Sequence, residues 1–177
     1  MRNLLYLILL GAALLTLALV VRSGLFLSKH PGEPINSAMR YALSEQSPQL
    51  SAEDARAIDL RFPTAYATQS GLRWVGRAPG TGSSHPHPGD EVTANYDGRL
   101  LDGTPFDSSY KRGVPFQFKV GTGQVIGGWD EAFLSMKKGE RRTLIVPYWL
   151  AYGEQGHPPT IPPRSTLVFD VELIDFR

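Results

Sequence analysis

From about residue 65 onwards, apolar and polar residues alternate along short segments of the chain. The clearest example is the stretch 91–101, in which Val92, Ala94 and Tyr96 alternate with polar neighbours. Alternation with a period of two is typical of a β-strand that buries one face and exposes the other. Similar segments predict further strands at 70–76, 115–120, 141–147 and 166–176. The pattern therefore predicts a mainly antiparallel sheet of about five strands, with one apolar face to cover.

The element that covers this face is expected to be a helix within residues 128–140, GWDEAFLSMKKGE. Its apolar residues fall at i, i+3, i+4 and i+7, on one side of a helix: Trp129, Ala132, Phe133 and Met136. Acidic residues open the segment and Lys137 and Lys138 close it, which suits the helix dipole. We expect Gly139 to end the helix. Together these elements predict an α+β fold.

The chain begins with an apolar run at 4–21, LLYLILLGAALLTLALVV, with no charge before Arg22. Eighteen helical residues rise roughly 27 Å, which is just enough to cross the hydrocarbon core of a bilayer. The run is either an uncleaved membrane anchor or a signal peptide, and the lack of an A-x-A cleavage site favours the anchor. Because such runs most often serve secretion, we expect an inner-membrane protein whose C-terminal part is periplasmic. Cleavage would instead give a soluble periplasmic protein.

Residues 28–64 are polar and small, with several prolines, and they predict a spacer. Two short helices are expected within it, at 36–45 and at 52–60, the second with Ser51 as its N-cap. The predicted organisation is therefore a membrane segment at 1–27, a spacer at 28–64 and a folded domain at 65–177.

Charge and cysteine content exclude several classes of site. The net charge is +1 and the basic residues do not cluster, which argues against a nucleic-acid partner. The chain has no cysteine, so disulfides and thiolate metal sites are excluded. His85 and His87 have no evident third ligand, so we interpret them as part of a solvated loop and predict no metal site.

Two other motifs match catalytic signatures only in part. The glycines of 121–127 are spaced one position too widely for a dinucleotide-binding fingerprint, so we interpret them as a turn that leads into the helix. Ser108 and Ser109 lie outside a Gly-x-Ser-x-Gly elbow, so a hydrolase nucleophile is not predicted. The sequence therefore predicts no cofactor.

Aromatic residues come from every segment of the predicted domain: Tyr96, Phe106, Phe116, Trp129, Tyr152 and Phe169. Most aromatic residues belong to a core. However, Tyr96, Trp129 and Tyr152 each carry a polar atom that needs a partner when it is buried. One small sheet covered by one helix also offers too little core to bury so many rings. We therefore expect some of these rings to line a pocket.

Three stretches resemble the FKBP-type peptidyl-prolyl cis/trans isomerases: VTANYDGRLLDGTPFDSSYKRGVPFQF, GQVIGGWDEAFLSMKKGERRTLIVP and AYGEQGHPPTIPPRSTLVFDVELI. The similarity runs in order from about Gly71 to Phe176. The joint presence of YDG, FDSS, VI-x-GW, AYG and LVFDVEL is very specific. The resemblance implies a twisted antiparallel sheet that wraps around a short helix, with a pocket between them.

Position by position, the resemblance also implies roles for residues around that pocket. Trp129 is expected to form the floor beneath a bound prolyl ring. Asp107, which follows Phe106, is expected to accept a hydrogen bond from ligands and to pair with Arg112. The apolar walls are expected to be Tyr96, Phe116, Val125 and Phe169.

The remaining implied roles concern the rim of the pocket. The backbone N–H of Ile126 and the hydroxyl of Tyr152 are expected to donate to carbonyl groups of a ligand. His157 and Ile161 are expected at the tip of a loop over the pocket, which the prolines of HPPTIPP would stiffen. The catalytic set implied by the resemblance is Tyr96, Phe106, Asp107, Tyr152 and Phe169.

The activity implied by the resemblance is rotation about Xaa-Pro bonds of proline-containing polypeptides, with macrolides of the rapamycin type as inhibitors. With a membrane segment at 4–21, the expected role is to assist the folding of exported proteins. The alternative is a membrane-anchored binding module that holds a proline or a macrolide without turnover. None of the implied site residues is plainly lost, which favours the enzyme.

Overall fold

The computed structural model describes residues 49–177. The apolar helix predicted at 4–21 and the short helix predicted at 36–45 therefore lie outside the described residues. Between residues 49 and 177, no helix combines the length and the apolar character that a membrane crossing requires.

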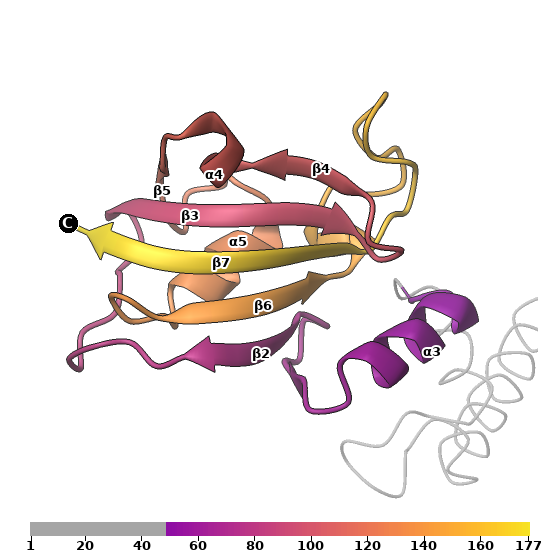
Figure 1. The fold of residues 1–177 in the computed structure, drawn as a ribbon, viewed down its shortest axis with the longest axis horizontal. Coiled ribbons are helices and arrows are strands. Elements are labelled where there is room, and N and C mark those ends of the chain that lie inside the picture. The colour runs from indigo at the N-terminus through magenta and orange to yellow at the C-terminus, as the bar shows by residue number, and fades with distance from the viewer. Residues whose placement is uncertain (1–48) are drawn as a thin grey trace, which may run out of the picture. The chain divides into compact units, whose positions relative to one another are not determined.

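The described residues form an antiparallel sheet of seven strands, seen face-on in Figure 1. The strands follow the order β1-β2-β6-β7-β3-β4, and β5 pairs with β3 beside β4. Their bounds are Tyr66–Ala67, Arg73–Ala78, Glu91–Leu100, Pro105–Ser108, Phe116–Lys119, Arg141–Val146 and Leu167–Phe176 for β1 to β7. The five predicted strands are thus confirmed, and two short strands, β1 and β4, were not predicted.

One face of the sheet is covered by helix α5, Gly127–Phe133, which lies behind the strands in Figure 1. The predicted helix of 128–140 is too long, because regular helix ends at Phe133. The hydroxyl of Ser135 donates to the Ala132 carbonyl at 2.8 Å, and the Arg142 guanidinium donates to the Ser135 carbonyl at 2.9 Å. These side chains donate to carbonyl groups that would accept backbone N–H groups in a longer helix, so the regular helix ends here.

The contact between α5 and the sheet is close. A Cβ atom at Gly128 would lie 2.5 Å from a methyl carbon of Val146 in β6, so only glycine fits there. The core between the two layers contains Leu72, Val92, Phe118, Val120, Ala132, Phe133, Met136, Leu144, Val146, Leu167 and Leu173. Met136 is fully buried although it follows the end of the helix, so its predicted inward position is correct.

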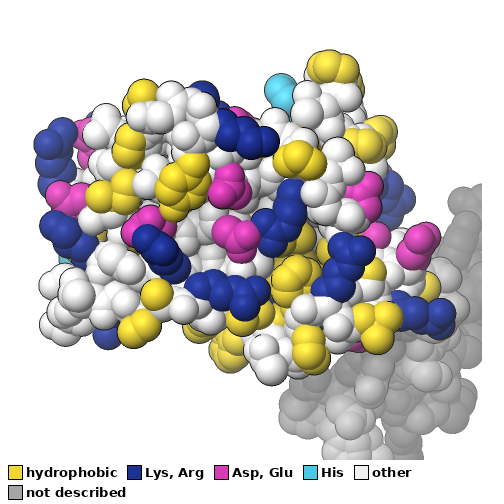
Figure 2. Space-filling view, viewed as in Figure 1, with side chains coloured by type: hydrophobic (Ala, Val, Ile, Leu, Met, Phe, Trp, Pro, Cys, Tyr) yellow, Lys and Arg dark blue, Asp and Glu magenta, His cyan; other side chains and the backbone are white. Residues whose placement is uncertain are grey.

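The opposite face of the sheet carries charged side chains of both signs, which Figure 2 shows across the middle of the view. Arg99 pairs with Asp170 at 2.5 Å and Arg141 pairs with Glu172 at 2.9 Å, each across neighbouring strands. This face is therefore the solvated side of an alternating pattern.

Helix α3, Ala52–Arg61, forms where a helix of 52–60 was predicted, and the Ser51 hydroxyl caps it by accepting the Asp54 N–H at 2.9 Å. Ile58 is buried, and the Thr166 hydroxyl donates to Asp54 at 2.6 Å. Leu50–Arg177 accordingly forms one compact unit. Residues 50–64, which we expected in the spacer, pack on the domain.

Candidate functional site

A cavity of about 570 Å³ opens beside α5. This volume lies within the usual range for small-ligand sites. Nine of the eleven predicted site residues line it: Tyr96, Phe106, Asp107, Phe116, Val125, Ile126, Trp129, Tyr152 and Phe169. Three further lining residues were missed: Gln124, Gly127 and Ala151. The missed residues are immediate neighbours of predicted ones along the chain, and none has a side chain that signals binding.

Trp129 is a buried part of this cavity, with only 4% of its surface exposed. Its ring meets those of Tyr96 and Phe169 edge-on, at centroid distances of 4.9 and 5.3 Å. Edge-to-face contacts at such distances are favourable for aromatic rings. The Trp129 indole N–H is buried and has no hydrogen-bond partner among the described residues. The cavity therefore has a rigid aromatic floor with one unused donor.

The loop before α5 is fixed by the carboxylate of Asp130, in the first turn of the helix. One carboxylate oxygen accepts the Gly121 N–H at 2.8 Å and the other accepts the Gly123 N–H at 2.9 Å. The predicted glycine turn into the helix is thus confirmed. Ile126 is the N-cap, in extended conformation, and its own N–H donates to no group within residues 49–177. Helix starts leave such donors free for ligands.

Asp107 is held by three groups, so its predicted pairing with Arg112 is confirmed. The Tyr96 hydroxyl donates to one carboxylate oxygen. The other oxygen accepts from Arg112 and, at 2.8 Å, from the Ser108 N–H. Arg112 also donates to the Tyr96 hydroxyl at 2.8 Å. The carboxylate therefore fixes the orientation of Tyr96 at the cavity wall.

Arg112 reaches this cluster because a single helical turn, α4, Ser109–Arg112, follows β4. Ser108 caps the turn, and Gly113 ends it with a φ of 71°, a conformation that favours glycine. α4 was not predicted from the sequence, because four residues are too short for a helical period to show.

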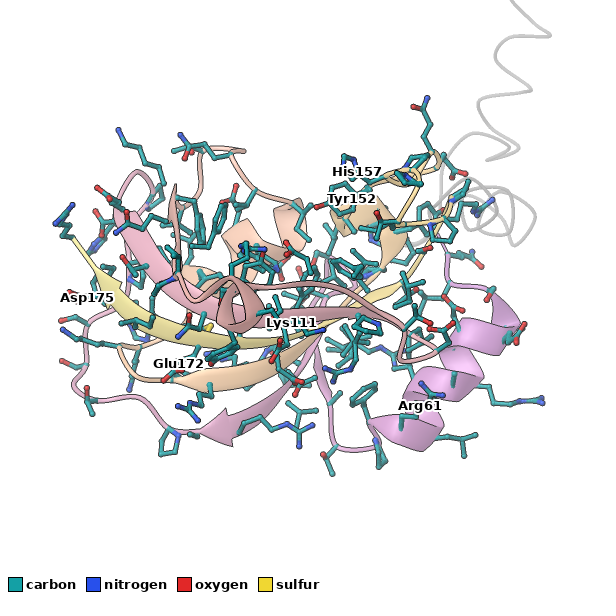
Figure 3. The ribbon with its side chains drawn as sticks, turned by 45° about the horizontal axis from the view of Figure 1, so that its top comes forward. Arg61, Lys111, Tyr152, His157, Glu172 and Asp175 are labelled. Carbon is teal, nitrogen blue, oxygen red and sulfur yellow. The ribbon has the colours of Figure 1, made fainter. Side chains whose placement is uncertain are left out.

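Tyr152 stands at the mouth of the cavity and is 40% exposed. Its hydroxyl makes no hydrogen bond within the described part of the chain. The ring of His157 stacks against it at 5.2 Å, and Figure 3 shows the two side by side at the rim. Tyr152 is therefore oriented by ring packing, while its hydroxyl is free to bind a ligand.

His157 and Ile161 do not themselves line the cavity. The His157 N–H donates to the Ile161 carbonyl at 2.8 Å and the Ile161 N–H returns the bond at 2.9 Å. Ile161 is 3% exposed and packs in the core. The pair thus lies beside the tip of the rim loop, residues 153–164, where its bridge encloses only residues 158–160.

Arg164 closes the base of the rim loop. Its N–H donates to the Gly153 carbonyl at 3.2 Å, and its guanidinium donates to the Tyr148 hydroxyl at 3.1 Å. Tyr148 begins a short 3₁₀ helix, η1, Tyr148–Leu150, which leads directly into Ala151 and Tyr152. Both ends of the loop therefore lie beside Ala151 and Tyr152, which line the cavity.

The free energy of unfolding is expected to fall as the pH rises above about 10. Burial, and then the Asp107 charge, raise the pKa of Tyr152 above its ordinary value. Burial, and then the hydrogen bond to Asp107, raise the pKa of Tyr96. As the pH rises, the unfolded chain therefore loses these protons before the folded chain does. The stabilisation from the two tyrosines is fully present below their pKa in the unfolded chain and is lost as the pH rises through their pKa in the folded chain. Urea titrations from pH 8 to 11 should show a shallower decline for Tyr152→Phe, and an unchanged decline would contradict this account.

Residues 82–174, just over half of this chain, match the family "FKBP-type peptidyl-prolyl cis-trans isomerase". The peptidyl-prolyl cis-trans isomerase FKBP15-2 of Arabidopsis thaliana is 55% identical over 96 residues, which cover 54% of this chain and 59% of that protein. Fkbp12 of Drosophila melanogaster, also a peptidyl-prolyl cis-trans isomerase, is 52% identical over 104 residues, 59% of this chain and 96% of that protein.

A solved structure is also similar. The crystal structure of FkpA from Escherichia coli aligns with a TM-score of 0.65 and 36% identity, covering 81% of this chain and 66% of that one. The match spans about three fifths of the Arabidopsis protein but nearly all of the Drosophila enzyme. The family match and these relatives show that the chain belongs to the FKBP-type peptidyl-prolyl cis-trans isomerases.

Proposed function

We propose that this isomerase binds the prolyl ring of its substrate over Trp129 and rotates the preceding peptide bond within the aromatic cavity. The observation that carries the proposal is the combination of an enclosed aromatic floor with two free donors beside it, the Ile126 N–H and the Tyr152 hydroxyl. An apolar ring suits the floor, and the flanking carbonyl groups suit the donors.

The chemistry fits such a site because amide rotation requires no nucleophile and no cofactor. The barrier of about 18–20 kcal/mol arises from the resonance that is lost as the C–N bond twists. Uncatalysed Xaa-Pro exchange takes tens of seconds, so exchange in milliseconds needs a factor of about 10⁴, or roughly 5.5 kcal/mol. A dry aromatic cavity disfavours the planar, more polar amide relative to the twisted one.

Hydrogen-bond donors at the rim of the cavity supply the second contribution to the acceleration of rotation. A hydrogen bond accelerates rotation only if it is stronger in the transition state than in the ground state. Tyr152 and Ile126 can provide such bonds to a carbonyl that turns during rotation. Asp107 already accepts from Tyr96, Arg112 and Ser108, so its main part in the mechanism is to orient Tyr96. It retains lone pairs for one further ligand donor.

The decisive experiment measures isomerisation of a short Xaa-Pro peptide by the full chain in detergent, with and without rapamycin. Turnover that rapamycin inhibits is expected, and the Asp107→Asn variant should reduce both turnover and rapamycin affinity. Tight rapamycin binding without turnover would instead assign the protein to the binding modules. Absence of both would overturn the proposal.

Replacing Tyr152 by phenylalanine is expected to lower kcat/KM by about tenfold at most, since one modest hydrogen bond contributes about 1 kcal/mol. The hydroxyl bonds no described residue, so the substitution should leave the free energy of unfolding within about 0.5 kcal/mol of the wild type. Steady-state assays and urea titrations on the same preparations test both statements. A thousandfold loss would mean that Tyr152 has a further role in the reaction.

We further propose that residues 4–21 hold the enzyme at the inner membrane, with the isomerase domain on the periplasmic side, where it assists the folding of exported proteins. The support is the uncharged apolar run and the absence of a clear cleavage site after it. Alkaline extraction of membranes should leave the full chain in the pellet, and added protease should digest the domain in spheroplasts. Release of a shortened chain would instead indicate a cleaved signal peptide.

A further inference from the structure

The turn at residues 68–72, just before β2, contacts two of the elements that form the cavity. The Ser70 hydroxyl donates to the carboxylate of Glu131 in α5 at 2.6 Å. The Ser70 carbonyl accepts the indole N–H of Trp149, in η1, at 2.8 Å. One residue therefore bonds both the helix that carries the floor and the 3₁₀ helix that leads to Tyr152.

The turn is itself well fixed, so it can act as a support. Leu72 is fully buried in the core. The Thr68 N–H donates to the Leu72 carbonyl at 2.9 Å, and the Thr68 and Ser70 hydroxyls are 2.8 Å apart. β2, which follows immediately, pairs with β6 along its length. A movement of this turn would therefore disturb the core as well as the surface.

Trp149 lies directly against the turn. Gly71 has a φ of +95°, and a Cβ atom placed there would lie 2.8 Å from Cζ2 of the Trp149 indole. The ring of Trp149 also meets that of Tyr148 edge-on at 5.1 Å. On the other side of η1, a Leu150 methyl carbon would lie 3.7 Å from a Cβ atom at Gly127. The 3₁₀ helix is thus enclosed between the turn and the start of α5.

We propose that Ser70, Gly71 and Trp149 form a brace that positions Tyr152 relative to Trp129. Trp149 precedes Tyr152 by three residues, and Glu131 follows Trp129 by two. Both bonds of Ser70 are made outside the cavity, so the three brace residues act through others and do not touch the substrate. This inference rests on the proposed function, since it assigns positioning residues to the same site.

The first test compares two glycine variants with nearly equal backbone strain. Gly71→Ala places a methyl group against Trp149 at a φ of +95°. Gly89→Ala adds a methyl group at a φ of +96°, where no atom lies within 4 Å. We expect Gly71→Ala to lower kcat/KM about fivefold and Gly89→Ala to change it less than twofold; the backbone strain is shared, and the contact with Trp149 adds to the loss of stability in Gly71→Ala alone. Equal kcat/KM values for the two variants would overturn the brace.

The second test removes the donor of the brace. Trp149→Phe keeps an aromatic ring but loses the indole N–H, and a fall in kcat/KM of about threefold to tenfold is expected. The KM for the peptide should change little, because the cavity floor is intact. Urea titrations establish that each variant is folded at the assay temperature.

The third test separates positioning from general weakening. If the brace acts through Tyr152, Gly71→Ala should lower kcat/KM by about twofold or less once Tyr152 is already phenylalanine, because coupled residues are not additive. The same fivefold fall in both backgrounds would mean that the brace only stabilises the fold. A wild-type chain without turnover would refute the proposed function, whereas an active wild type with insensitive variants would refute the brace alone.

Discussion

Replacing Trp129 by alanine is expected to reduce turnover below detection and to lower the free energy of unfolding by about 3–5 kcal/mol. The side chain is 4% exposed and packs against aromatic rings from four parts of the chain, including those of Tyr96, Phe118 and Phe169. Its loss would remove the cavity floor and leave a void that these rings fill only in part. Peptide isomerisation and urea titration on the full chain measure the two effects.

Trp129→Phe is the matched control, because it keeps an aromatic floor and removes an indole N–H that has no partner among the described residues. Removal of an unsatisfied buried donor relieves part of the cost of the smaller ring. We expect this variant to stay within about 2 kcal/mol of the wild type in stability. An alanine variant that folds and turns over within tenfold of the wild type would contradict the role of Trp129 as the floor.

Gly156→Ala is expected to disrupt the rim loop and to destabilise the protein by about 2–5 kcal/mol. Gly156 has a φ of +68°, and a Cβ atom there would lie 2.4 Å from the carbonyl oxygens of both Ile161 and Pro162. Backbone oxygens cannot move aside as a flexible side chain could, so the loop must open. His157 would then leave its stacked position on Tyr152, and kcat/KM should fall about tenfold.

Gly153→Ala provides the comparison in the same loop. Its φ is +65°, but no atom lies within 4 Å of the added methyl group, so it should cost only the strain of about 1–2 kcal/mol. Amide hydrogen exchange should report faster exchange at His157 and Ile161 in Gly156→Ala alone. Two variants with the same stability and the same exchange rates would show that the close packing around Gly156 is unimportant.

The local patterns of the sequence were sufficient to predict most of the regular secondary structure. Alternation located five of the seven strands in the described residues, and helical spacing located α5 and the inward position of Met136. The end of α5 was not predictable in this way, because it depends on Arg142, a residue of β6 that reaches the Ser135 carbonyl. β1 has two residues, which is too short for a periodic signal, and β4, PFDS, is as short as β5 but does not alternate.

The site was predictable where it depends on residue type and unpredictable where it depends on contacts between distant segments. The family resemblance supplied nine cavity residues and the pairing of Arg112 with Asp107. It placed His157 and Ile161 at the tip of a loop over the cavity; their mutual backbone bonds lie beside that tip, but neither residue lines the cavity. The bond between Ser70 and Trp149 joins residues 79 positions apart, and no local pattern indicates it.

The position of β2 also determines which recombinant fragments of this protein are expected to aggregate. The region shared with the family begins at residue 82, but β2 ends before it, at Ala78. A fragment trimmed to that boundary would leave β6 as an open edge strand, with unpaired backbone groups beside Leu144 and Ile145. Exposed apolar edges of this kind recruit strands from other molecules and lead to aggregation. A fragment that starts at Leu50, where the compact unit begins, keeps this edge covered and is expected to aggregate less.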